Sequence, residues 1–435
     1  MKENHNIVTV PQRAWWGDIK LKLDFPEHWD VHECRMNGHN APKLTQEGFR
    51  KAFADPIGCR PIREQAKGKK RVVILFDDMS RPTKAAEIVP FVLDELEAAG
   101  VQEEDIQFIC SPGSHGPLSA YDFAKKLGQD VISRFNVYNH NMYENCTYIG
   151  TTSRGTPVNL NTEYVNADFK IAIGALLPHI NVGFGGGGKI VLPGIASIES
   201  IMHNHGPVRN NAAKTGIDSN TGLGRYECNA QLLDTEEACK MSGLNIKIDA
   251  IVNINRDTTA LFVGDPIAQY YEAVKLAKDH YHSNRVENPD VVIANCYAKG
   301  NETVIGTYVG QSLLPESGGM LVMITDNPAG EVCHFLRRSF GNHIGGRYWN
   351  PPSLPKKIKK FVLLMPHKNK ASVDWFAPPE QITWTEKWEE VRNILADDYP
   401  DGPRVAVIPD ATMQYFEGIE RTPFVGKGAQ EIERT

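Results

Sequence analysis

The sequence predicts an α/β protein made of two α/β domains, each built on a mainly parallel sheet. Short apolar runs typical of buried strands alternate with stretches of helical periodicity. Polar loops rich in glycine and proline separate them. The length of 435 residues exceeds what one ordinary hydrophobic core fills. With a polar linker candidate at 283–289, we expect an N-terminal domain over residues 1–285 and a C-terminal domain over residues 286–435.

The expected elements of the first domain follow in order from these patterns. Alternation of apolar and polar residues predicts an antiparallel strand pair over residues 15–31. Thr83 as N-cap and Gly100 as the residue after the C-cap predict a helix over 83–99. The other expected strands are 72–76, 106–110, 131–138, 169–176 and 246–255, with a hairpin over 147–159. The other expected helices are 45–54, 119–127, 195–203, 230–241 and 266–280, whereas 206–215 reads as irregular.

The second domain repeats the pattern of apolar strands. Its expected strands are 290–295, 320–325, 361–365 and 405–408, with one helix near 385–396. The first of these strands follows the linker candidate directly, which places the domain boundary there.

Composition restricts the function classes. Hydrophobic residues make up 41% and charged residues 23%, fractions that are typical of soluble globular proteins. The net charge of -6 argues against nucleic acid as the main partner, because phosphate binding needs clustered positive charge. No apolar run approaches the ~20 residues of a membrane helix, and no secretory signal is expected at the N-terminus. Eight scattered cysteines without a CxxC pair predict neither a zinc ribbon nor a disulfide framework, so we expect a reduced, cytoplasmic enzyme.

Four consecutive glycines, Gly185 to Gly188, stand directly before Lys189 in a loop that follows an expected strand. Glycine loses the most backbone entropy on folding, so such a run is retained where the backbone must approach something closely or adopt positive φ. A flexible linker more commonly mixes glycine with serine and lies outside a strand–loop unit. We interpret the loop as a ligand cradle, with Gly186, Gly187, Gly188 and Lys189 as binding residues.

An alternative interpretation of the same loop is a nucleotide-binding P-loop. The spacing of Gly183, Gly188 and Lys189 fits most of the Walker A pattern. The pattern fails at Ile190, where a serine or threonine hydroxyl would hold magnesium. A P-loop-like nucleotide hydrolase is therefore the weaker alternative.

Three loops that follow strands carry the candidate functional residues. They span 77–82, 111–117 and 178–194. In an open parallel sheet such loops emerge together at the carboxyl ends of the strands, where ligands bind. We expect these loops to bring together Asp78, Arg81, His115, His179 and Lys189.

Histidine is the side chain best suited to proton transfer near neutral pH. His115 or His179 alone could be an ordinary exposed loop residue, but on neighbouring strand ends they would form a two-sided acid–base pair. Asp78 and Arg81 at a helix entrance favour a phosphate or carboxylate, or else a helix cap and a surface ion pair. His203 and His205 are two residues apart, and such positions diverge on a helix. At most one of these last two histidines is therefore expected in the site.

These motifs resemble the nickel-dependent lactate racemase family in order and spacing over much of residues 70–210. The matching motifs are Asp78-Met79-Ser80-Arg81-Pro82, Gly113-Ser114-His115, Pro178-His179, Gly185-Gly186-Gly187-Gly188-Lys189 and His205. The resemblance implies two α/β domains with the active site in the cleft between them. It also implies a nickel-pincer nucleotide, the Ni(II) complex of pyridinium-3,5-bisthiocarboxylic acid mononucleotide.

The same resemblance implies a role for each matched residue. Lys189 would carry the cofactor covalently, and His205, not His203, would be the protein ligand to nickel. His115 and His179 would act as acid and base on the two faces of the substrate carbon. Asp78 and Arg81 would hold the nucleotide or the substrate carboxylate.

The implied activity is racemisation or epimerisation of a 2-hydroxy acid by hydride abstraction and return. The implied partners are a small-molecule substrate and the host's cofactor-biosynthesis proteins, with no nucleic acid or membrane.

The substrate half of the pattern departs from the lactate-specific members. Those members have a Tyr-Pro-x-Asp segment followed by Tyr-Gln-x-x-Lys after the first strand of the second domain. Here residues 297–308 read YAKGNETVIGTY, so that Tyr297 aligns and the Tyr-Gln-x-x-Lys set is absent. We therefore expect a 2-hydroxy acid other than lactate, with Arg81, Tyr297 and Lys299 as candidate substrate residues. A homologue that binds the cofactor without turnover is a further alternative.

Overall fold

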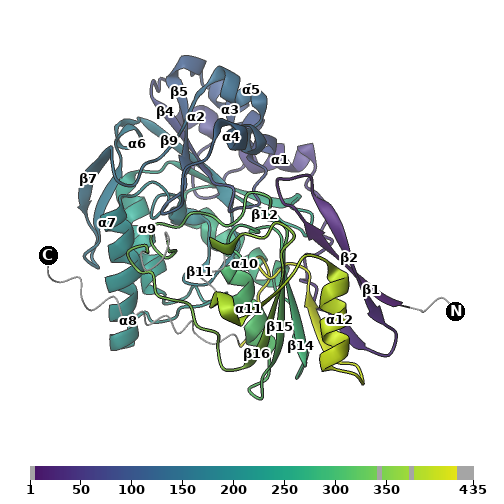
Figure 1. Cartoon of the computed structure of the whole chain (residues 1–435). Coiled ribbons are helices and arrows are strands. Elements are labelled where there is room, and N and C mark those ends of the chain that lie inside the picture. Colours follow the sequence, from purple (N-terminus) through teal and green to yellow (C-terminus); the bar gives the residue numbers. More distant parts are fainter. Residues whose placement is uncertain (1–4, 340–344, 372–376, 419–435) are drawn as a thin grey trace. The chain divides into compact units, whose positions relative to one another are not determined.

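The computed structural model describes residues 5–339, 345–371 and 377–418, and the chain forms two compact units (Figure 1). The central unit comprises residues 40–279. The terminal unit combines residues 5–39 with the described residues after 279. The end of the central unit lies near the expected boundary at 285, but residues 5–39 differ from the expectation because they belong to the unit formed by the C-terminal part of the chain.

The central unit contains a six-stranded sheet in the order β13-β12-β9-β4-β5-β6. All neighbours are parallel except β12 and β13, which are antiparallel. Every residue of β4 and β12 is buried, as in parallel sheets covered on both faces. The strands are β4 (Val72–Asp77), β5 (Ile106–Ser111), β6 (Asn136–Asn139), β9 (Phe169–Ala175), β12 (Ile246–Val252) and β13 (Thr258–Gly264).

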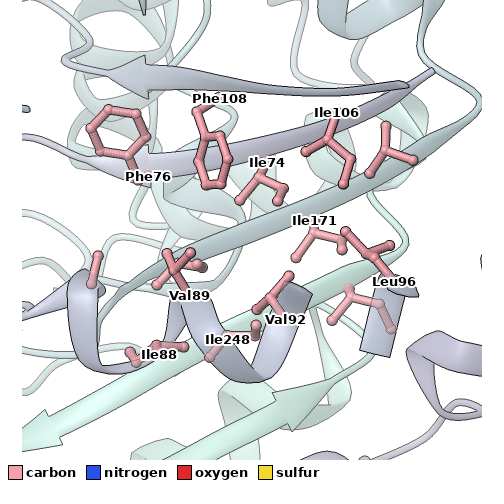
Figure 2. Packing of buried hydrophobic residues seen from close by; sticks show 14 of the residues in the cluster. Ile74, Phe76, Ile88, Val89, Val92, Leu96, Ile106, Phe108, Ile171 and Ile248 are labelled. Carbon is pink, nitrogen blue, oxygen red and sulfur yellow. The ribbon is translucent and has the colours of Figure 1, made fainter. Parts of the chain in front are cut away.

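Helix α3 (Val89–Ala98) covers this sheet through an apolar face. Figure 2 shows Val92 and Leu96 of α3 close to Ile74 and Ile171 of the strands, within one buried cluster. Each such side chain stabilises the fold by about 1.5–3 kcal/mol relative to exposure. The other helices of the unit are α1 (Gln46–Ala54), α2 (Ile62–Gln65), α4 (Ala120–Leu127), α5 (Gln129–Arg134), α6 (Thr162–Asn166), α7 (Ile198–His203), α8 (Arg209–Thr215), α9 (Ala230–Ser242) and α10 (Ala268–His280).

Local sequence signals explain several of these boundaries. Ser119 caps α4 in a capping box with Asp122, as the predicted helix over 119–127 requires. The hairpin of β7 (Cys146–Thr151) and β8 (Pro157–Asn161) confirms the one expected over 147–159. The eight cysteines are free thiols.

Two predicted elements were wrong, and the helix predicted over 83–99 begins later than expected, although it ends before Gly100 as predicted. Thr83 does not cap a helix, because its hydroxyl donates to Asp77 at 2.6 Å and α3 begins only at Val89. The expected strand over 131–138 is helix α5 up to Arg134 followed by the short strand β6. The stretch 206–215 is not irregular, since a π-helical turn over Asn204–Val208 continues into α8.

The terminal unit has its own six-stranded sheet, in the order β17-β16-β15-β14-β18-β3 and parallel throughout. The N-terminal segment belongs here because β3 pairs with β18. The expected antiparallel pair exists as β1 and β2, shifted toward the N-terminus. The elements are β1 (His5–Gln12), β2 (Ile19–Pro26), β3 (Asp30–Glu33), β14 (Val291–Cys296), α11 (Val304–Leu313), β15 (Gly319–Thr325), β16 (Ile358–Leu364), β17 (Ile382–Thr385), α12 (Trp388–Asp398) and β18 (Arg404–Ile408). Among the described residues, no helix combines the length and apolar character needed to cross a membrane.

Candidate active site

The carboxyl ends of β4 and β5 join two of the predicted site residues. Asp78 follows β4 and His115 follows β5, and both side chains are buried. The Nδ1 atom of His115 lies 2.6 Å from Oδ2 of Asp78. The structure thus makes a carboxylate–imidazole pair from residues that the sequence placed on separate loops.

Ser80 and Arg81 complete the loop around Asp78. The Ser80 amide donates to Asp78 Oδ1 at 2.9 Å, and the Ser80 hydroxyl donates to the same oxygen. Arg81 in turn donates from its guanidinium to the Ser80 hydroxyl oxygen at 2.8 Å. Burial alone would raise the pKa of Asp78, but attraction to His115 and Arg81 outweighs it and lowers the pKa to about 2. The Asp78 carboxylate is therefore ionised and oriented toward His115.

Beneath this loop lies a buried ion pair that the sequence reasoning missed. Lys126 Nζ lies 2.7 Å from Asp77 Oδ1 and donates to the carbonyl oxygens of Asp78 at 2.9 Å and Arg81 at 3.0 Å. Asp77 Oδ2 also accepts from the Ala175 amide at 3.1 Å. Burial lowers the pKa of Lys126, opposed by the charge of Asp77. This pair fixes the ends of β4 and β9 with respect to each other.

His179 lies in a tight hairpin of β10 (Pro178–His179) and β11 (Gly183–Phe184). Its Nδ1 atom accepts from the backbone amides of Asn181 at 3.1 Å and Val182 at 3.4 Å. The Asn229 side chain holds the turn by donating to the Asn181 carbonyl at 2.8 Å. At Gly183, with φ of +81°, an added Cβ would lie 2.5 Å from the backbone of Arg225. The turn is therefore packed on both sides.

The glycine loop is anchored by a second buried ion pair. The Gly187 amide donates to Asp249 Oδ2 at 2.8 Å, and Gln269 donates to the same oxygen at 2.8 Å. Lys247 Nζ lies 2.6 Å from Asp249 Oδ1, and both side chains are fully buried. Lys189 follows in the 3-10 turn Gly187–Ile190.

Two of the glycines adopt positive φ, as predicted, with +88° at Gly186 and +51° at Gly187, and the loop also lies close against other parts of the protein. An added Cβ would lie 2.9 Å from Asp249 at Gly186, 2.8 Å from Tyr270 at Gly187 and 2.8 Å from Cys239 at Gly188. At these three positions the protein's own interior occupies the space that a side chain would need. At Gly185 the nearest heavy atom to an added Cβ is 3.7 Å away.

The loop does not have P-loop geometry. A Walker A loop leads into a helix whose N-terminus faces the phosphates. Here Lys189 lies in a 3-10 turn, Val191 and Leu192 are buried, and α7 begins only at Ile198. This geometry removes the support for a nucleotide hydrolase.

His203 and His205 have different partners, as their spacing predicts. His203 Nδ1 lies 2.9 Å from the Thr156 hydroxyl, which donates to Asp234 at 2.7 Å. His205 lies in the π-helical turn, a feature frequent at functional sites, with Nδ1 3.1 Å from the carbonyl oxygen of Ile201. A carbonyl only accepts, so Nδ1 of His205 carries the proton and Nε2 carries the lone pair that a metal would need.

Within the described residues, no group of three or more histidine, cysteine or acidic side chains could hold a metal ion.

Tyr297 and Lys299 follow β14 in the terminal unit. The Tyr297 hydroxyl donates to Asp18 at 2.7 Å, and the Lys299 amide donates to the Thr412 hydroxyl at 3.1 Å. Asp410 accepts from the amide of Ala298 at 2.8 Å, which fixes the turn. Both candidate substrate residues thus stand at the carboxyl end of a parallel strand.

Comparison with known proteins adds an independent observation. Residues 16–216 match the family model described as the lactate racemase N-terminal domain. The lactate racemase of Thermoanaerobacterium thermosaccharolyticum is 27% identical over 255 residues, which are 57% of this chain and 58% of that protein. The lactate racemase of Lactiplantibacillus plantarum is 28% identical over 244 residues, 55% of each chain. The matched region therefore spans little more than half the length of these relatives.

The solved structure of the lactate racemase apoprotein from Thermoanaerobacterium thermosaccharolyticum has a TM-score of 0.71 with this chain. The match covers 94% of this chain and 100% of that chain at 21% identity. At this level of identity, the likeness shows that the two chains share a fold.

Proposed function

Because residues 16–216 match the family model described as the lactate racemase N-terminal domain, we propose that the chain is a racemase or epimerase of a 2-hydroxy acid. The observation that carries the proposal is the buried Asp78–His115 pair at the ends of β4 and β5, with 2.6 Å between Oδ2 and Nδ1. An imidazole held by an ionised carboxylate is a proton-transfer group. His179, on the loop after β9, is the second such group in the proposal.

The proposed cofactor is the nickel-pincer nucleotide, attached at Lys189 and bound through nickel by His205. Two observations support these roles: the tautomer of His205 places the ring's lone pair at Nε2, and Lys189 lies in a loop anchored by Asp249. The chemistry that such a cofactor supplies when bound is acceptance of the C2 hydride and its return. Nickel accepts imidazole ligands readily.

The protein's own residues handle the proton and the carboxylate. His115 and His179 take the proton of the substrate hydroxyl and give it back on the two faces of C2. Asp78 orients His115, and the Arg81 guanidinium beside it offers a cation for the substrate carboxylate. The altered stretch 297–308 supports a substrate other than lactate, with Tyr297 and Lys299 as candidate contacts.

The cofactor is tested with protein made in a host whose biosynthesis proteins build it. Intact-mass spectrometry should show a nucleotide-sized adduct on the Lys189 peptide that is lost in Lys189→Ala. Metal analysis should find about one nickel per chain, as a single imidazole-ligated centre implies. His205→Ala should lose the nickel, whereas the matched control His203→Ala should keep it. An unmodified Lys189 in active enzyme would contradict covalent attachment.

The reaction is tested with a panel of 2-hydroxy acids by chiral chromatography. Substrate deuterated at C2 should keep its deuterium in the product, because a hydride moves without exchange. Rapid loss of deuterium to solvent would favour deprotonation beside the carboxylate instead. Nickel retention without turnover on any substrate would identify a non-catalytic cofactor-binding protein.

A further inference from the structure

The two histidines of the proposed acid–base pair have opposite kinds of partner at the same ring nitrogen. Nδ1 of His115 faces a carboxylate oxygen at 2.6 Å. Nδ1 of His179 instead faces two backbone amides, at 3.1 Å and 3.4 Å. Because a neutral imidazole carries one proton on two nitrogens, these partners decide where that proton lies.

On His115 the proton lies at Nδ1. The carboxylate of Asp78 is ionised and can only accept, so Nδ1 must donate to it. The Ser80 hydroxyl, 3.5 Å from the same Nδ1, already donates to Asp78. The nearby ammonium of Lys126 is bound by Asp77 and by backbone carbonyls. The lone pair of the neutral ring is therefore at Nε2.

On His179 the proton of the neutral ring lies at Nε2. Backbone amides can only donate, so Nδ1 keeps its lone pair while it accepts from Asn181 and Val182. The turn cannot easily relax, since Asn229 holds the Asn181 carbonyl and Gly183 packs against Arg225. The resting tautomer of His179 is thus imposed by its own hairpin.

We propose that His115 and His179 rest in opposite tautomers, with His115 as the resting proton acceptor. His179 becomes a proton acceptor only when the turn between His179 and Gly183 releases Nδ1. Asp78 and the Asn181 amide are the positioning groups that set this difference. The proposal rests on the proposed function, because the two rings are taken as the acid–base pair of one reaction.

The proton balance of the reaction follows from this assignment. In the proposed reaction, Nε2 of His115 would take the hydroxyl proton when the C2 hydride leaves, and Asp78 would stabilise the resulting imidazolium. To protonate the carbonyl oxygen from Nε2 on the opposite face, His179 must first take a second proton from water at Nδ1, which requires the turn to release Nδ1. Donation from Nε2 would leave the remaining proton on Nδ1, where it would point at the Asn181 N–H if the turn were closed. The turn therefore stays open until His179 regains its resting tautomer, and the proton gained by His115 returns to water.

The test is nitrogen-15 NMR of histidine-labelled protein without cofactor, which reports the proton position on each ring. Signals are assigned by their loss in His115→Gln and His179→Gln. The expected result is a protonated Nδ1 and an unprotonated Nε2 on His115, and the reverse on His179. The same tautomer on both rings would overturn the proposal.

The variant Asp78→Asn tests the positioning role directly. The Ser80 amide donates to Oδ1, so the new amide oxygen is held there and the new NH₂ group faces His115. His115 must then accept at Nδ1 and shift its proton to Nε2, with an activity loss of about 10²- to 10⁴-fold in the loaded enzyme. The control Ser80→Ala keeps the carboxylate and should keep the tautomer of His115. An unchanged His115 spectrum in Asp78→Asn would refute the role of Asp78.

These measurements separate the tautomer proposal from the proposed function. The NMR experiment needs neither cofactor nor substrate, so its outcome stands even if no 2-hydroxy acid is turned over. Conversely, turnover on the substrate panel together with identical tautomers on both rings would leave the function standing and remove the tautomer proposal.

Discussion

Gly188→Ala should destabilise the central unit without any ligand present. A Cβ at Gly188 would lie 2.8 Å from Cys239 Cβ and 3.2 Å from the carbonyl oxygen of Thr235, both in α9. Non-bonded carbon atoms pack best at about 3.5–4.0 Å, so α9 or the loop must move by roughly 1 Å. Neither neighbouring atom is the flexible end of a side chain.

The expected loss in the free energy of unfolding follows from these contacts. Overpacking a well-packed interior costs about 1–3 kcal/mol. Replacing glycine restores about 0.4–1 kcal/mol through the lower entropy of the unfolded chain. The backbone φ of Gly188 is not in the positive range, so strain adds nothing. We expect a net loss of about 1–2 kcal/mol.

The assay is urea unfolding of the cofactor-free protein, followed by circular dichroism. The matched control is Gly185→Ala, whose new Cβ would lie 3.7 Å from the Leu177 carbonyl oxygen. This control should unfold within about 0.5 kcal/mol of the unmodified protein. If Gly188→Ala is as stable as the control, the conclusion that internal packing requires Gly188 is wrong.

Two further predictions concern the buried charges. Asp249→Leu should lose about 3–5 kcal/mol of unfolding free energy, because Lys247 is left as an unpaired buried cation. The double variant with Lys247→Met should recover most of this loss in the same urea assay. A double variant as unstable as the single one would contradict this reasoning. The second prediction concerns Asp78, whose pKa of about 2 in the folded protein lies below its ordinary value. Its ionised form therefore stabilises the fold above about pH 4, and this stabilisation is lost as the pH falls toward 2. Between pH 4 and pH 2, the free energy of unfolding of Asp78→Asn should therefore fall by roughly 2 kcal/mol less than that of the unmodified protein. An equal fall in both proteins would show that Asp78 is not the group responsible.

The sheets were predictable because buried parallel strands are almost continuously apolar. Strands β4, β9, β14 and β15 stand out in the sequence for this reason. Strand β3 could not be found in this way, since its residues Asp30 to Glu33 are largely polar and it is an edge strand of the terminal sheet. Residues 5–39 were therefore predicted in the N-terminal domain, although they belong to the terminal unit.

Tertiary packing explains why residues 206–215 form a helix. The segment is rich in asparagine and contains Pro207, which locally favours irregular structure. Val208 and Ala212 nevertheless pack against Ala230 in a small buried cluster. That contact outweighs a weak local preference, which a reading of propensity alone cannot anticipate.

The candidate site was only partly visible in the sequence. Histidines and glycines in loops after strands are conspicuous, whereas Asp77, Lys126, Lys247 and Asp249 look like ordinary charged residues. A signal did exist for the last two, because they lie within an apolar strand whose every residue is buried. Charged residues are almost never fully buried unless they are paired, so a lysine and an aspartate in such a strand predict a buried pair.

The two buried ion pairs lie next to each other at the carboxyl end of the central sheet. An added Cβ at Gly174 of β9 would lie 3.3 Å from both Asp77 Oδ2 and Lys247 Nζ, so the missing side chain allows the two pairs to approach each other. The opposite charges of Lys126 with Asp77 and of Lys247 with Asp249 balance, which makes burial of four charges tolerable. One end of this cluster holds the Asp78 loop through Lys126, and the other holds the glycine loop through the Gly187 amide. The Asp78 loop, which pairs with His115, and the loop that carries Lys189 are therefore held by the same cluster of buried ion pairs.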